Sequence, residues 1–157
     1  MNIKEAMQTA ITYEKRVRDA YQQAMKQAQN PEIKKILGAL AHDEHDHLRY
    51  LQDSYKLWRD TGQLHFEVLK SEIDWIALRG SLDAVLETLK PMKSASGSLR
   101  QAVEQAHAVE QETHDFYVGL LSGLRQNLKP IFERFVKSEA DHLAVVGKLL
   151  ESLQNKT

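Results

Sequence analysis

The sequence contains the same polar pattern twice, and this repeat is the feature that most constrains the fold. Residues 44–48 (EHDHL) match residues 139–143 (EADHL) at an offset of 95 positions. A second match, at an offset of 96, relates Glu14, Asp19 and Tyr21 to Glu110, Asp115 and Tyr117. The difference of one position falls between the patterns, where loops absorb changes in length. We therefore interpret the chain as two related halves.

The composition predicts that both halves are helical. Ala, Leu, Gln, Glu and Lys dominate, and only seven Gly and three Pro interrupt the chain. These residues favour helix, whereas Pro and Gly disfavour its interior. Breaks are expected at Asn30-Pro31, at Thr61-Gly62 and between Asn127 and Pro130. The predicted long helices cover about 2–29, 31–60, 97–126 and 129–154.

The connection between the second and third helices is long, and this fits two hairpins that pack as copies. The hairpins cover 2–60 and 97–154, and the crossover 61–96 must then run the length of the bundle. A helix of about 29 residues spans roughly 43 Å, which a crossover of this length covers easily. Within it, Ser81 favours the start of a short helix that ends at Lys90, before Pro91. We predict a single all-α domain over residues 1–157.

Each long helix carries an apolar seam that a glutamate interrupts near its middle. The apolar positions alternate at spacings of four and three, so they share one face of the helix and point toward a bundle core. The interrupting residues are Glu14, Glu44, Glu110 and Glu139, and in two helices His47 and His142 follow three positions later.

A third Glu-x-x-His pair, Glu104 and His107, serves as a control because it lies off the seam. One such pair alone is weak evidence of a site. The two pairs on the seams lie at matching positions along their helices, within the repeated pattern, and chance explains this combination poorly. We expect the off-seam histidines to face solvent: His42, His45, His65, His107 and His114.

Charge balance indicates what the seam residues hold. Four carboxylates inside an apolar bundle are costly unless protons, buried cations or metal ions neutralise them. No Lys or Arg lies on the seams near them. Because residues three positions apart share a helix face, Glu44 with His47 can bind one ion and Glu139 with His142 another. Glu14 and Glu110 can each add a carboxylate. Such ligands suit iron or manganese, with zinc as a substitute.

Other residues near the seams have two interpretations that the sequence leaves open. Tyr21 and Tyr117 lie two turns after their glutamates, so each hydroxyl either bonds a ligand carboxylate or belongs to an ordinary core aromatic. Asp43, Asp46 and Asp141 either accept from ring N–H groups of ligating histidines or are solvated. The alternative for the four glutamates and two histidines together is a metal-free bundle with Glu–His hydrogen bonds and raised glutamate pKa values.

At these residues the chain resembles the ferritin-like di-iron carboxylate bundles, in which two helices each give a Glu and two each give a Glu-x-x-His pair. Within that superfamily it resembles the rubrerythrins. The residues that carry the resemblance are Glu14, "EHDH" (44–47), Glu110 and "EADH" (139–142), with Tyr21 and Tyr117 in support. It implies a ferritin-like four-helix bundle made of two repeated helical hairpins with a long crossover containing a short helix.

The resemblance also implies a chemistry. Two iron ions per chain would reduce hydrogen peroxide or dioxygen, with manganese or zinc as possible replacements. The chain has no cysteine, so it lacks the rubredoxin iron site of rubrerythrins proper and would need an external electron donor such as a separate rubredoxin. Thr113 stands where rubrerythrins tend to carry an additional glutamate. We do not expect the fifth short helix of cage-forming ferritins. We therefore expect a homodimer rather than a storage cage.

Three other functions remain open at this point: iron binding with ferroxidase activity but no turnover, hydroxylation of an organic substrate, and a structural bundle without metal. Composition restricts the partners. The formal net charge is −1, which favours neither nucleic acid nor an anionic membrane surface. No apolar run reaches the length of a signal peptide or a membrane span. We expect a cytoplasmic protein.

Overall fold

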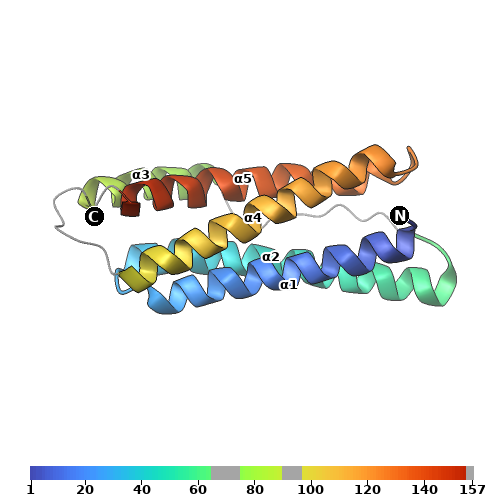
Figure 1. Cartoon of the computed structure of the whole chain (residues 1–157), viewed down its shortest axis with the longest axis horizontal. Coiled ribbons are helices and arrows are strands. Elements are labelled where there is room, and N and C mark those ends of the chain that lie inside the picture. Colours follow the sequence, from blue (N-terminus) through green and yellow to red (C-terminus); the bar gives the residue numbers. More distant parts are fainter. Residues whose placement is uncertain (65–74, 90–96, 155–157) are drawn as a thin grey trace.

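The computed structural model describes residues 1–64, 75–89 and 97–154, and these form an all-α, ferritin-like bundle (Figure 1). The helices are α1 (Ile3–Gln27), α2 (Pro31–Thr61), α3 (Trp75–Leu89), α4 (Gly97–Gly123) and α5 (Lys129–Gln154). The all-α prediction is confirmed, and the long helices begin and end within about three residues of their predicted bounds, as expected for helix ends.

The local sequence explains where the first two helices begin and end. The side chain of Asn2 accepts from the backbone N–H of Glu5, and the Glu5 carboxylate accepts from the backbone of Asn2, which is a capping box. Asn30 caps α2 with its side chain, which accepts from the backbone N–H groups of Glu32 and Ile33, and Pro31 lies in the first turn. Gly62 ends α2 in the left-handed conformation, with φ of 72°.

The helices pack as two hairpins. α1 packs on α2, α4 packs on α5, and α1 with α4 joins the two pairs. Figure 1 shows the four long helices running along one another. α3 packs on α5 and α2, and it lies beside the start of α2, at the opposite end of the bundle from Gly62 (Figure 1). The crossover predicted over residues 61–96 stays a prediction. Residues 65–74 and 90–96 lie outside the described part, as does His65.

The predicted start of the short helix was wrong, because α3 begins at Trp75 and Ser81 lies inside it. The reason is packing. Leu82 and Val85 are buried in the core, and Leu78 and Leu86 pack against the same cluster. These positions share one helix face, so burial favours a longer helix over a start at the capping residue. The predicted last residue, Lys90, lies outside the described residues.

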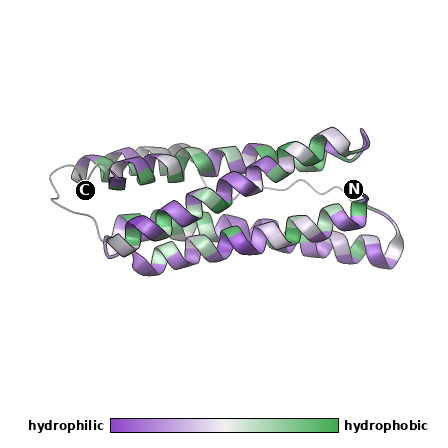
Figure 2. Ribbon diagram, in the orientation of Figure 1, coloured by the Kyte–Doolittle hydropathy of each residue, from purple (hydrophilic) through white to green (hydrophobic). Residues whose placement is uncertain are grey.

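The apolar core has two parts, separated by a polar layer. Figure 2 shows hydrophobic and hydrophilic residues alternating along each helix, as amphipathic packing requires. One cluster is aliphatic except for Tyr21 and includes residues of all five helices. The other is built around Tyr117, Phe132 and Phe135. In every long helix the buried polar residues fall between the positions that belong to the two clusters.

None of the described helices is both long enough and apolar enough to cross a membrane.

Candidate metal centre

The polar layer consists of side chains that are almost entirely removed from solvent. Each exposes at most 1% of its surface, and together they are Glu14, Asp43, Glu44, His47, Glu110, Thr113, Glu139 and His142. All six residues that the seams predicted as ligands are among them, so their predicted burial is confirmed. Off the seams, His42 and His45 are exposed, and His107 and His114 are partly buried.

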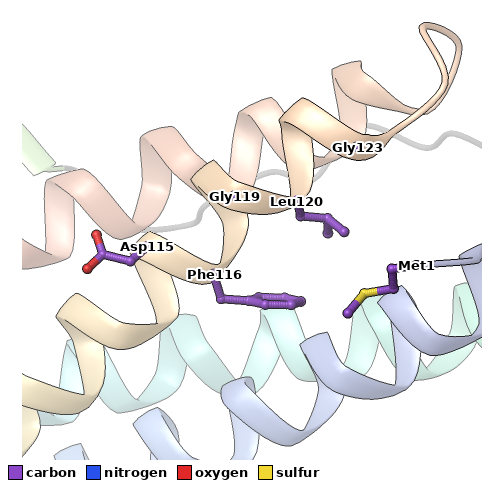
Figure 3. A pocket seen from close by; sticks show the side chains of 6 residues that line it. All are labelled: Met1, Asp115, Phe116, Gly119, Leu120 and Gly123. Carbon is purple, nitrogen blue, oxygen red and sulfur yellow. The ribbon is translucent and has the colours of Figure 1, made fainter.

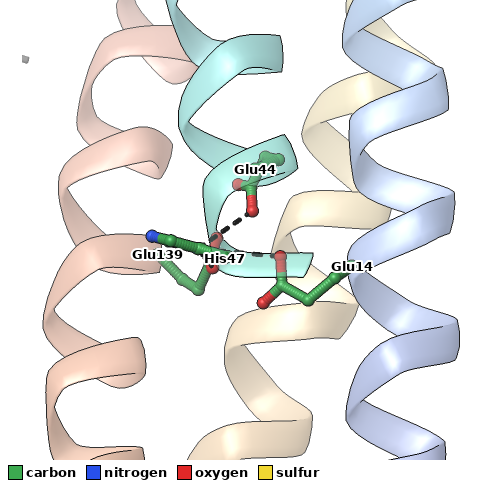
Figure 4. A group of neighbouring side chains, drawn as sticks. All are labelled: Glu14, Glu44, His47 and Glu139. Atoms are coloured by element: carbon green, nitrogen blue, oxygen red, sulfur yellow. Dashed lines mark hydrogen bonds and ion pairs between the residues drawn. The ribbon is translucent and has the colours of Figure 1, made fainter. Parts of the chain in front are cut away.

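The first group of candidate ligands gathers around His47. Figure 4 shows His47 and Glu44 from α2, Glu14 from α1 and Glu139 from α5 converging in the core. Their ligand atoms all lie within 4.8 Å of one another. His47 Nδ1 is 3.0 Å from Glu139 Oε1, 3.2 Å from Glu44 Oε2 and 3.6 Å from Glu14 Oε2.

The second group gathers around His142 in the same way. It contains Glu44, Glu110, Glu139 and His142, again with ligand atoms within 4.8 Å of one another. His142 Nδ1 contacts a carboxylate oxygen of Glu44, and it lies 3.2 Å from Glu139 Oε2 and 3.5 Å from Glu110 Oε2. The two imidazole rings stack with centroids 5.6 Å apart.

Glu44 and Glu139 belong to both groups. The sequence assigned each of them to the ion bound by the histidine of its own helix. The structure adds that each also faces the histidine of the other helix, because His47 contacts Glu139 and His142 contacts Glu44. Glu44 and Glu139 thus offer ligand atoms to both groups, whereas Glu14 and Glu110 each belong to one group.

The donor set fits two divalent cations. Four buried carboxylate oxygens, one on each glutamate, have no hydrogen-bond partner: Glu14 Oε2, Glu44 Oε2, Glu110 Oε1 and Glu139 Oε2. Buried acceptors are normally satisfied, and no Lys or Arg is buried among the described residues. Four carboxylates would balance two divalent ions with both histidines neutral, and mixed oxygen and imidazole ligation suits iron or manganese.

Without metal, protons must compensate for this concentration of acid. Burial raises the pKa of Glu44 and Glu110, and the charge of Glu139 raises both further. Burial alone would raise the pKa of Glu139 too, but hydrogen bonding to Glu110 and the charge of His142 hold it well below its usual value. Burial would lower the pKa of both histidines, yet the facing carboxylates raise the pKa of each. A cation that enters the layer takes the place of protons.

Comparison with known proteins identifies the family likeness. Residues 1–55 match the rubrerythrin family model. Over this segment the chain is similar to the rubrerythrins, and its fold is ferritin-like. The matched segment contains Glu14, Glu44 and His47, while Glu110, Glu139 and His142 correspond to them through the internal repeat. No curated protein and no solved structure matches the chain. The buried acidic and histidine cluster of this rubrerythrin-like bundle is compatible with a di-iron site.

The two tyrosines of the rubrerythrin-like bundle bond the terminal carboxylates crosswise. The Tyr21 hydroxyl donates to Glu110 Oε2, and the Tyr117 hydroxyl donates to Glu14 Oε1, and the oxygen–oxygen distance is 2.5 Å in both hydrogen bonds. The structure thus decides between the two interpretations of these residues in favour of the hydrogen bond. Each tyrosine reaches the glutamate of the other repeat rather than that of its own helix. Burial, followed by the charge of the accepting glutamate, raises the pKa of both phenols.

The three aspartates near the histidines lie in different surroundings. Asp43 is buried, and its Oδ2 is 2.7 Å from Nε2 of His142. Asp46 lies on the surface side of α2, 3.5 Å from Nε2 of exposed His42, and makes no described contact with His47 or His142. Asp141 is partly buried. The prediction of a carboxylate behind a buried histidine is thus met at Asp43.

Sequence reasoning missed Ser138, whose Oγ is 3.1 Å from Nε2 of His47. The repeat offers the signal, since Ser138 matches Asp43 at the same offset of 95 that relates Glu139 to Glu44. Thr113, one turn after Glu110, is also buried, and its hydroxyl donates to the backbone carbonyl of Val109. This hydrogen bond uses the hydroxyl donor of Thr113, the residue that stands where rubrerythrins tend to carry an additional glutamate.

A pocket of about 400 Å³ opens near the first turn of α1 (Figure 3). Its lining consists of Met1, Asp115, Phe116, Gly119, Leu120 and Gly123. None of the six candidate ligands is among these residues, so this pocket does not provide the apolar space beside the metals that hydroxylation of an organic substrate would need.

Proposed function

We propose that this protein is a di-iron oxidoreductase that reduces hydrogen peroxide or dioxygen with electrons from an external donor. The observation that supports the proposal is the pair of four-residue ligand groups that share Glu44 and Glu139. Two metal sites that share carboxylates would suit a two-electron reaction better than two isolated sites would, because each ion would supply one electron. The rubrerythrin match over residues 1–55 supports the same chemistry.

The residues have distinct roles in this proposal. Glu14 and His47 would hold one ion, Glu110 and His142 the other, and Glu44 and Glu139 would contact both. When bound, two ferrous ions supply the two electrons that convert hydrogen peroxide and two protons into two water molecules. A one-electron carrier, such as a rubredoxin, must return those electrons, since the chain has no cysteine for a rubredoxin site of its own.

The protein matrix fixes the carboxylates before any substrate arrives. Tyr21 and Tyr117 each hold one oxygen of a terminal glutamate and leave the other without a hydrogen-bond partner. Because the layer lies between two apolar clusters, bulk water is excluded and electrostatic interactions within it are strong. The arrangement is preorganised, which limits the rearrangement that metal binding and electron transfer demand.

The test is a single-turnover reaction. Protein loaded with iron and fully reduced under anaerobic conditions is mixed rapidly with hydrogen peroxide, and ferric absorbance is followed. We expect one peroxide to oxidise about two irons per chain within seconds, and repeated turnover when a reduced rubredoxin is supplied. Glu110→Ala should remove the fast phase.

The matched control is Glu104→Gln with His107→Gln, the Glu-x-x-His pair outside the polar layer, which should leave the fast phase intact. Slow oxidation combined with retention of many more than two irons per chain would indicate iron sequestration instead. Equal reactivity of wild type and Glu110→Ala would refute the proposal.

A further inference from the structure

The two histidines of the polar layer differ in what lies behind them. Both turn Nδ1 toward the shared carboxylates. On the opposite side of the ring, Nε2 of His142 lies 2.7 Å from Asp43 Oδ2, whereas Nε2 of His47 lies 3.1 Å from Ser138 Oγ. Asp43 Oδ2 is 3.7 Å from Nε2 of His47, which is beyond a hydrogen bond.

This difference breaks the internal symmetry of the chain at one pair of matching positions. Asp43 and Ser138 occupy the same place in the two repeats, immediately before Glu44 and Glu139. The contacts to the glutamates are duplicated: each histidine faces both shared glutamates, and each terminal glutamate accepts from a tyrosine. The pair of residues behind the rings therefore distinguishes two otherwise similar ligand sets.

A carboxylate and a hydroxyl act differently on an imidazole that binds metal. A carboxylate that accepts the N–H of the ring fixes its tautomer and makes the opposite nitrogen a stronger donor. It also adds a negative charge close to the cation. A neutral hydroxyl orients the ring with a weaker hydrogen bond and adds no charge. Loss of such a carboxylate partner generally lowers metal affinity by about 10- to 100-fold.

We propose that Asp43 is a positioning residue that makes the two metal positions inequivalent, so that the position of Glu110 and His142 fills first and binds more tightly. The position of Glu14 and His47, with Ser138 behind it, fills second. This inference rests on the metal centre of the proposed function and adds the order in which its two positions are occupied.

The experiment is a titration of the metal-free full-length chain with cobalt(II), followed by absorbance and by calorimetry. Wild type should bind two ions in two steps that differ at least about 10-fold in affinity. Asp43→Ser, which places a hydroxyl behind both rings, should merge the steps by weakening the first. Ser138→Asp, which places a carboxylate behind both rings, should merge them by strengthening the second.

Two further variants locate the ions. His47→Ala should retain the tight step, and His142→Ala should lose it. The exchanged protein, Asp43→Ser with Ser138→Asp, should reverse that pattern when each histidine is removed in turn. Because a merely structural role for Asp43 would weaken both steps or unfold the protein, the strengthening caused by Ser138→Asp is the readout that structure alone does not explain.

The inference is overturned if wild type binds two ions with equal affinity, or if the two histidine variants lose the same step. It also falls if Ser138→Asp leaves the second step unchanged. Since cobalt binding requires no oxidant, these failures are distinguishable from failure of the proposed reaction. A chain that binds cobalt in the predicted order but does not consume peroxide contradicts only the proposed function. A chain that binds no cobalt contradicts both.

Discussion

The two ends of the core, on either side of the polar layer, are built from different residues. At one end α3 adds Leu82 and Val85 to a cluster that is aliphatic apart from Tyr21. At the other end aromatic rings fill the space, with Phe135 at the centre: its ring lies 5.0 Å from Tyr117 and 5.1 Å from His47, centroid to centroid. The two halves of the polar layer, by contrast, nearly duplicate each other.

This contrast shows which positions chemistry fixes and which it does not. An apolar cluster needs only residues whose shapes together fill the volume, and many combinations meet that need. A buried layer of four carboxylates needs every charge to be compensated, so the loss of one member leaves others without a partner. The repeat therefore keeps the glutamates, histidines and tyrosines, whereas core positions such as Leu37 and Phe132, or Leu40 and Phe135, differ between the two halves.

Among the variants that test this contrast, Phe135→Ala should have the largest effect on stability. Truncation of a buried aromatic should lower the free energy of unfolding by about 3–5 kcal/mol. Because Phe135 packs edge-on against His47, this variant should also weaken one metal position. Leu149→Ala, in the aliphatic end, should cost about 2–5 kcal/mol and leave metal affinity unchanged. Urea unfolding and a metal titration of both variants test the difference.

The tyrosines test the duplication of the polar layer. Tyr21→Phe and Tyr117→Phe each remove a buried hydrogen bond to a carboxylate, so each should cost about 1.5–3 kcal/mol in the metal-loaded protein. The two losses should agree within about 0.5 kcal/mol if the halves are equivalent at this level. A large loss in one variant and none in the other would show that the cross-repeat bonds are not equivalent.

The metal-free protein should become less stable as the pH rises. The pKa of His47 and of His142 is raised by the facing carboxylates against the effect of burial. Their stabilisation is therefore complete below the usual histidine pKa of about 6.5 and is lost as the pH rises through the raised values. The raised pKa values of Glu44 and Glu110 act in the same direction, and the lowered one of Glu139 acts against it.

Each histidine can contribute up to about 1.4 kcal/mol per pH unit within that window. Urea unfolding between pH 6 and 9 in the presence of a chelator measures the slope. Saturation with metal should abolish or reverse it, because metal binding displaces the protons. A metal-free protein whose stability is constant across this range would contradict the assignment of protons to the layer.

The smallest effect concerns the attachment of α3. Lys148 Nζ lies 3.8 Å from Asp83 Oδ1, and both side chains are largely exposed. Such a pair contributes about 0–1 kcal/mol, so Lys148→Ala should hardly change the melting temperature. Leu82→Ala should lower it clearly, because the apolar face holds α3 in place. Equal effects of the two variants would indicate that the ion pair, rather than the apolar face, holds α3 in place.

Much of the site could be predicted from the sequence because two patterns coincide in it: the helical spacing of apolar residues and the internal repeat. The spacing of four and three residues placed Glu14, Glu44, Glu110 and Glu139 on core-facing seams, and the repeat placed them at one depth. The start of α3 could not be predicted, because Ser81 is a good capping residue and only the burial of Leu82 and Val85 decides against it.

Contacts between helices were harder to predict than the faces of single helices. The crosswise bonds of Tyr21 to Glu110 and Tyr117 to Glu14, and the sharing of Glu44 and Glu139, depend on the distance and rotation between helices. Periodicity within one helix carries no such information. Ser138 was missed because a serine resembles an ordinary surface residue unless its match with Asp43 in the other repeat is taken into account.

The measurement that tests the central claim most directly is the iron content of the purified chain after anaerobic loading. We predict about two irons per chain for wild type and for Glu104→Gln with His107→Gln. We predict none for Glu44→Ala with Glu139→Ala, because these carboxylates belong to both ligand groups. Folded wild type without iron, or a double variant that keeps both ions, would contradict the assignment of the polar layer as a metal centre.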